Sequence, residues 1–233
     1  MDPAAIDRSL ASCEARLAQR GRVDLAALGF WKAVSAVKRD ARLVERYADR
    51  IARVDRGAFL RSTPLALPAW AGVALASLGT AVGAVLVVAA PYLHEVVGTG
   101  DRLPLMELAY IAGAGVLIGM THGLAHWIVG GLVGIRFTHF FSKLVPPQPG
   151  FKTDYATYLR APARSRAWMH ASGAIVSKVI PFLVAGIAAA GGARSWAVIV
   201  LLAIGVVQLI TDATLSTRAS DWKRFRREMR FAR

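Results

Sequence analysis

The residues best able to do chemistry are His122 and His126, which stand four apart in an uncharged segment. No Asp, Glu, Lys or Arg occurs between Leu108 and Gly134, and about 20 apolar residues suffice to cross a bilayer. On a helix, residues four apart share one face, with Cβ atoms about 6 Å apart. Ionisable groups at membrane depth are costly and usually face a protein interior or a water-filled cavity. The pair therefore predicts a metal site within a membrane-spanning helix.

A carboxylate at matching depth could complete this site. We expect the second span to begin near Leu103 and the fourth near Ser195. At about 1.5 Å per residue, His122 then lies about 28 Å and Asp212 about 26 Å from the start of its helix. Two imidazoles and a carboxylate match an open zinc site with one free position, and they also suit iron(II). The predicted metal ligands are thus His122, His126 and Asp212, with zinc preferred over iron.

Other arrangements of these polar residues stay open. His170, at the predicted start of the third span, could supply a fourth ligand and close the site. Asp212 could instead cap its helix or pair with Lys178. We expect the side chain of Lys178 to extend to the membrane interface rather than to have a catalytic role. A haem held by His126 and His170 is a further alternative. Di-iron hydroxylases need many more histidines than the 5 present.

The composition indicates an all-α polytopic membrane protein. Of the 233 residues, 55% are hydrophobic, and the mean hydropathy is +0.43, which is too apolar for an ordinary soluble domain. We predict an amphipathic helical region at 1–62, a four-helix membrane domain at 63–216 and a basic tail at 217–233. The predicted spans are 66–91, 105–133, 171–191 and 195–214, and a loop at 135–169 joins the second and third.

The placement of positive charge predicts the topology. The net charge is +14, and residues 1–63 carry 13 Lys or Arg against 8 Asp or Glu. The loop at 135–169 and the tail are also strongly basic, whereas the connections at 94–103 and 192–195 are not. Loops rich in Lys and Arg stay on the cytoplasmic side. We therefore expect both termini and the middle loop to be cytoplasmic, in the plasma membrane. The abundant Ala and Arg are typical of a GC-rich bacterium.

The basic charge does not predict a nucleic-acid partner. Lys and Arg next to spans attract anionic lipids and fix topology without any further partner. The segment 221–227 mixes basic and aromatic residues, as in a helix that lies at the membrane interface. Membrane lipids are thus the expected partners. Cys13 is the only cysteine, so an intrachain disulfide and a thiolate metal cluster are excluded.

The segment His122-Gly123-Leu124-Ala125-His126, followed by Gly134-Ile135-Arg136-Phe137, resembles the His-Glu-x-x-His motif of site-2 proteases, a family of intramembrane zinc metalloproteases. The resemblance covers about residues 105–215. It implies zinc as the cofactor and makes Asp212 the counterpart of the family's third ligand. Asp212 is, however, followed by Ala-Thr rather than by the family's Gly. The glutamate that activates the zinc-bound water corresponds here to Gly123, which offers no base.

These residues lead to three functional hypotheses. The first is a non-proteolytic relative of the site-2 proteases that binds metal and transmembrane protein clients or another membrane-embedded ligand. The second is an active metalloenzyme, a peptidase or lipid-phase hydrolase, in which a group such as His170 replaces the missing base. The third is a small ion or solute transporter that uses the polar residues as a path. The absence of an evident repeat argues against the third.

Overall fold

The computed structural model describes residues 1–19, 21, 23–63, 65–97, 104–144, 147–214 and 220–232, with only the backbone described at 94–97, 143–144 and 147–148. Four helices in this part are long and apolar enough to cross a membrane. They are α4 (Ala69–Val97), α5 (Leu105–Leu132), α7 (Ala163–Ala190) and α8 (Ser195–Thr214). The prediction of an all-α polytopic membrane protein is confirmed. The third of these helices begins at Ala163 rather than at 171.

The backbone divides into two compact units. The membrane unit comprises Val73–Val129 and Ala167–Arg227. The helix–sheet unit comprises Met1–Gly72, Gly130–Arg166 and Glu228–Arg233. Each unit has a hydrophobic core of its own.

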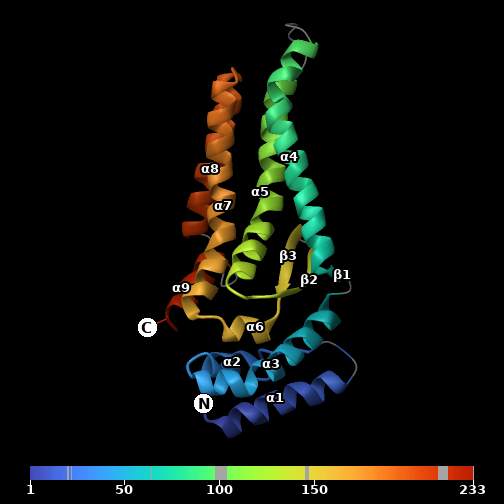
Figure 1. The fold of residues 1–233 in the computed structure, drawn as a ribbon, viewed down its shortest axis with the longest axis vertical. Coiled ribbons are helices and arrows are strands. Elements are labelled where there is room, and N and C mark those ends of the chain that lie inside the picture. Colours follow the sequence, from blue (N-terminus) through green and yellow to red (C-terminus); the bar gives the residue numbers. More distant parts are fainter. Residues whose placement is uncertain are drawn as a thin grey trace. The chain divides into compact units, whose positions relative to one another are not determined.

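In the membrane unit, glycines let α4 and α5 run side by side (Figure 1). A Cβ at Gly79 of α4 would lie 2.6 Å from Met120 Cγ, and one at Gly83 would lie 2.9 Å from Leu117 Cγ. From α5, Gly113 faces α4 in the same way, and its added Cβ would lie 3.0 Å from the Gly83 carbonyl oxygen. Small residues four apart allow this close approach in membranes, where helices associate mainly by packing.

Two further glycines connect the other helices of the membrane unit. A Cβ at Gly191, just after α7, would lie 2.4 Å from the hydroxyl of the buried Tyr110 on α5. Gly205 of α8 packs against the ring of Phe182 on α7, where a Cβ would lie 2.6 Å from the nearest ring atom. Large apolar side chains are exposed along α4, α7 and α8. This exposure is what lipid-facing helix surfaces require.

The helix–sheet unit starts with three helices, α1 (Pro3–Ala18), α2 (Phe30–Val37) and α3 (Ala41–Ser62). Asp2 caps α1 by accepting from the Ala5 N–H at 2.6 Å, and Asp40 caps α3 by accepting from the Arg42 N–H. The helices bury a common apolar core. Its fully buried large side chains include Ile6, Leu10, Phe30, Val37, Tyr47, Ile51 and Val54.

A three-stranded antiparallel sheet was not predicted from the sequence. Strand β2 (Phe137–Leu144) lies between β1 (Ala66–Pro68) and β3 (Pro147–Thr153). The segment of β2 and β3 was expected to lie within the loop at 135–169, and β3 contains the prolines Pro147 and Pro149. They are tolerated because β3 is an edge strand, where a missing N–H need not break a ladder bond. The short helix α6 (Tyr155–Arg160), capped by Asp154, follows the sheet.

A buried charged cluster also belongs to the helix–sheet unit. Glu228, near the end of α9 (Asp221–Met229), is fully buried. Its Oε1 lies 2.5 Å from Lys38 Nζ, and its Oε2 accepts from Arg166 Nε at 2.7 Å. Arg166 also donates to the backbone oxygens of Leu159 and Ala161. These partners compensate for the burial of the charges.

Candidate metal centre

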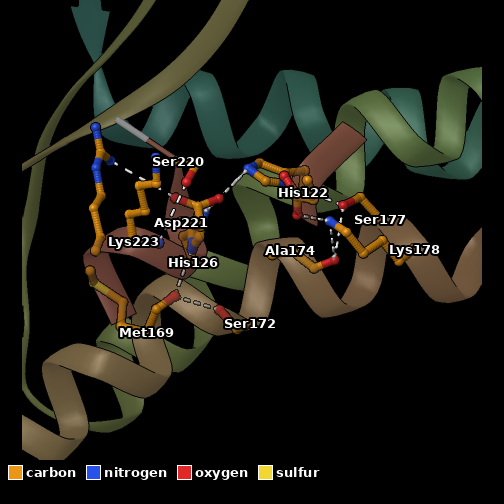
Figure 2. Close-up of polar contacts among 12 residues, drawn as sticks. His122, His126, Met169, Ser172, Ala174, Ser177, Lys178, Ser220, Asp221 and Lys223 are labelled. Atoms are coloured by element: carbon orange, nitrogen blue, oxygen red, sulfur yellow. Dashed lines mark hydrogen bonds and ion pairs between the residues drawn. The ribbon is translucent and has the colours of Figure 1, made fainter. Parts of the chain in front are cut away.

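The two histidines point toward one another from successive turns of α5, as Figure 2 shows. Their Nε2 atoms are 3.2 Å apart, and their rings are nearly perpendicular, at 89°. The side chain of His122 is 35% exposed and that of His126 is 17% exposed. The pair is therefore partly buried but accessible.

Contacts with α7 determine which ring nitrogens carry protons. His126 Nδ1 lies 2.6 Å from the Met169 carbonyl oxygen, which can only accept a hydrogen bond. Its Nδ1 must therefore be protonated, and in the neutral ring Nε2 then has a free lone pair. His122 Nδ1 lies 3.5 Å from Ser177 Oγ, and this hydroxyl donates to the Ala174 carbonyl. Bonds of this kind orient histidines that bind metals.

A glycine of α7 makes room for this arrangement. A Cβ at Gly173 would lie 2.4 Å from His126 Nε2 and 2.8 Å from the His122 carbonyl oxygen. No side chain could occupy that position without displacing His126. Gly173 was not among the site residues expected from the sequence.

The acid that joins the histidines is Asp221, the first residue of α9. Its Oδ2 lies 3.2 Å from His122 Nε2 and 3.3 Å from His126 Nε2. Its side chain is 15% exposed. Ser220 precedes it and accepts from the Lys223 N–H at 3.4 Å. In the part of the chain that the structure describes, His122, His126 and Asp221 form the one group of three such residues whose ligand atoms converge.

The three atoms form a nearly equilateral triangle with sides of 3.2, 3.2 and 3.3 Å. A tetrahedral zinc ion binds nitrogen and oxygen at about 2.0–2.1 Å, which separates neighbouring ligand atoms by about 3.3 Å. The triangle thus has the dimensions of one face of such a tetrahedron. The fourth vertex is left for water or another ligand.

The electrostatics of the site favour a cation. Burial by itself raises the pKa of Asp221, but hydrogen bonds with His122 and His126 and their charges outweigh burial and bring the pKa well below its ordinary value. Asp221 is therefore a carboxylate at neutral pH. These hydrogen bonds need a proton on each Nε2, which a neutral His126 protonated on Nδ1 lacks. A positive ion between this nitrogen and the carboxylate would supply the missing charge.

Asp212 is not part of this group, which corrects the predicted ligand set. Its Oδ2 lies 2.5 Å from Lys178 Nζ, so Asp212 takes the alternative partner considered from the sequence. A matching depth along two helices does not determine the direction in which a side chain points. Lys178, on α7, neutralises Asp212 within the membrane unit.

The other predicted residues lie close to the pair but outside the triangle. The buried ring of His170 lies 6.4 Å from the ring of His126, between centroids. Gly123 lies on α5 between the two histidines and provides no carboxylate. A haem between His126 and His170 is disfavoured, because α7 approaches His126 too closely at Gly173 to admit a porphyrin.

Asp221 was missed because the whole of its segment, 221–227, was expected to lie at the membrane surface. One signal could have identified it. The pair Ser220-Asp221 begins a short helix, and Asp221 is one of only two acids, with Glu228, in the strongly basic segment after the last span. Both acids are paired with positive or imidazole groups in the structure.

Comparison with known proteins gives no further identification. No family model, no curated protein and no solved structure matches the chain.

Proposed function

We propose that the chain is a membrane-embedded metal-binding protein that holds a single divalent ion, zinc in preference to iron, through His122, His126 and Asp221. The observation that carries the proposal is the triangle of ligand atoms, with sides of 3.2–3.3 Å. The bonds from the two Nδ1 atoms to Met169 and Ser177 support it, because they leave both Nε2 atoms free to bind.

We further propose that the protein is a non-proteolytic relative of the site-2 proteases. The histidine pair on an apolar helix supports this kinship. Two features separate the chain from an active protease. The first is Gly123, which replaces the general base, a group that typically contributes 10²–10⁴-fold in rate. The second is the third ligand, which comes from a helix that follows the last span, whereas the family's third ligand lies within that span. The free fourth position would bind a transmembrane client or another membrane-embedded ligand.

The position of His170 supports a second candidate, an active metalloenzyme. Its ring lies near that of His126, close enough for a substitute base to act through a water molecule. In that case His170→Ala would abolish hydrolysis and leave metal binding intact.

We further propose a bacterial plasma membrane location, for which the abundant Ala and Arg are the support. The charge distribution supports a topology with both termini and the segment 135–169 in the cytoplasm. Each of these segments is rich in Lys and Arg, as the positive-inside rule requires.

Metal content of the purified full chain tests the proposed centre. We expect zinc bound to the wild type in a one-to-one ratio and lost in His122→Ala, His126→Ala and Asp221→Ala. Asp212→Asn is the matched control, because it removes the charge of a membrane-unit acid outside the triangle, and it should retain zinc. Zinc retained by Asp221→Ala, or absent from wild type purified with zinc, would refute the proposal.

A further inference from the structure

Helix α9 carries Asp221 on one face and a basic stripe on another. Lys223, Arg226 and Arg227 are exposed, and their spacing of three and four places them on one side of the helix. Asp221 and Phe225, also four apart, lie on a different side. The ring of Phe225 packs 5.4 Å from Trp168 and 5.8 Å from Trp222, between centroids.

The chain itself keeps α9 close to a membrane surface. Helix α8 ends at Thr214 and α9 begins at Asp221. Even a fully extended connection of this length spans no more than about 25 Å. The aromatic cluster on the other side of α9 includes Trp168, which is 54% exposed, and tryptophan is typical of the interface between lipid and water.

From this arrangement we infer that the basic stripe of α9 binds the anionic headgroups of the surrounding bilayer, and that this contact strengthens metal binding. The inference rests on the proposed metal centre. Negative lipid surfaces attract juxtamembrane Lys and Arg, so the stripe and the headgroups have complementary charge. Because Asp221 is on the same helix, a bilayer that holds α9 in place also holds the third ligand beside the histidines.

Linkage gives the direction and the size of the effect. If anionic lipid favours the position of α9 that metal binding needs, it must raise the affinity for metal, and metal must in turn strengthen the lipid contact. One Lys or Arg near an anionic surface contributes about fivefold to binding. For one such contact made only in the position of α9 that binds metal, we therefore expect a rise in zinc affinity of up to about fivefold.

The test compares zinc affinity of the full chain in nanodiscs of phosphatidylcholine alone and in nanodiscs that also contain phosphatidylglycerol. Wild type should bind zinc more tightly with phosphatidylglycerol, and added salt should weaken the effect. The triple variant Lys223→Gln, Arg226→Gln, Arg227→Gln should bind zinc equally in both lipids. The matched control Arg8→Gln, Lys32→Gln, Arg39→Gln removes the same charge from exposed positions of the helix–sheet unit and should keep the lipid effect.

The outcomes separate this inference from the proposed function. Equal zinc affinity of wild type in both lipids overturns the inference and leaves the metal centre standing. If both triple variants lose the rise in zinc affinity with phosphatidylglycerol to the same extent, the inference is also overturned, because the net charge of the chain would then explain the rise. Inorganic phosphate or a DNA duplex could also be added to phosphatidylcholine nanodiscs. If either raises the zinc affinity as much as phosphatidylglycerol does, the basic stripe does not bind the bilayer specifically and the inference is overturned. A chain that binds no zinc in either lipid refutes both proposals.

Discussion

At the scale of single residues, the site depends on an absent side chain as much as on its ligands. Gly173 allows the backbone of α7 to contact the imidazole of His126, and Met169, one turn earlier, accepts its Nδ1 proton. Both positions would act on the orientation of a proposed ligand rather than on the metal itself. Such supporting contacts typically change metal affinity by 10–100-fold.

We expect Gly173→Ala to weaken zinc binding at least about tenfold, because the new methyl would displace the ring of His126. Gly186→Ala on the same helix is the control, since a Cβ there meets nothing within 4 Å. Both changes add the same helix propensity. Competition with a chelator measures the zinc affinities of the two variants. Equal affinities would show that zinc binding does not need the close packing at Gly173.

Gly123→Glu tests whether the missing base alone separates the chain from a protease. We expect the variant to cleave a model transmembrane substrate in a zinc-dependent manner, with a gain of about 10²–10⁴-fold over wild type. Gly123→Gln matches the size of glutamate but cannot accept the proton, so it should stay inactive. A zinc-loaded Gly123→Glu protein without cleavage would show that the missing base is not the only feature that separates the chain from an active protease.

The contrast between Asp212 and Asp221 shows what residue types and spacing can predict. The histidine pair could be read directly, because four residues along one helix fix the relative position of two side chains. The acid comes from another helix, so its identity depends on helix rotation and on competing partners. Lys178 pairs with Asp212. The sequence indicated this pairing as one alternative but could not decide between it and a role for Asp212 as a metal ligand.

At the scale of elements, the spans were predictable and the sheet was not. Long uncharged apolar runs identify membrane helices by length and composition alone. The strands β2 and β3 pair through backbone groups, which any side chain allows. Pro147 and Pro149 in β3 interrupt the sequence pattern by which a strand is normally predicted. The early start of α7 was hidden for a similar reason, because Arg164 and Arg166 look like loop residues. Arg166 is in fact buried, where Glu228 compensates its charge.

The Glu228 cluster predicts a pH-dependent stability of the helix–sheet unit. Burial tends to raise the pKa of Glu228, but the charges and hydrogen bonds of Lys38 and Arg166 lower it below its ordinary value of 4.5. A carboxyl with a lowered folded-state pKa stabilises the fold above its unfolded pKa. That stability is lost as the pH falls from about 4.5 through the folded value.

We therefore expect Glu228→Gln to lower the stability at neutral pH by about 3–5 kcal/mol, because two buried cations lose their anion. The variant should also lose less stability than wild type on acidification. Thermal unfolding of the full chain as a function of pH measures both effects. Glu45→Gln is the control, since its side chain is 80% exposed and such pairs contribute at most about 1 kcal/mol. Parallel pH curves for wild type and Glu228→Gln would contradict the prediction.

At the scale of the whole molecule, the charge pattern gives a testable orientation. We expect a membrane-impermeant maleimide to label Ser195→Cys in intact cells, because this position is the first residue of α8 and follows a poorly charged connection. Arg39→Cys should react only after permeabilisation. Both positions are exposed, so they form a matched pair. The native Cys13 will not interfere, because burial raises the pKa of its thiol and keeps it protonated. Labelling of Arg39→Cys in intact cells would reverse the proposed topology.

The location of Asp221 also has a consequence for biogenesis. The residue follows His126 by 95 positions, and all four apolar helices precede it in the chain. A ribosome must therefore release nearly the entire polypeptide before the proposed ligand set exists. Every hydrophobic segment can enter the bilayer first. If zinc binds as proposed, its acquisition would be a final maturation step, and a nascent chain arrested ahead of α9 would be inserted without the third ligand.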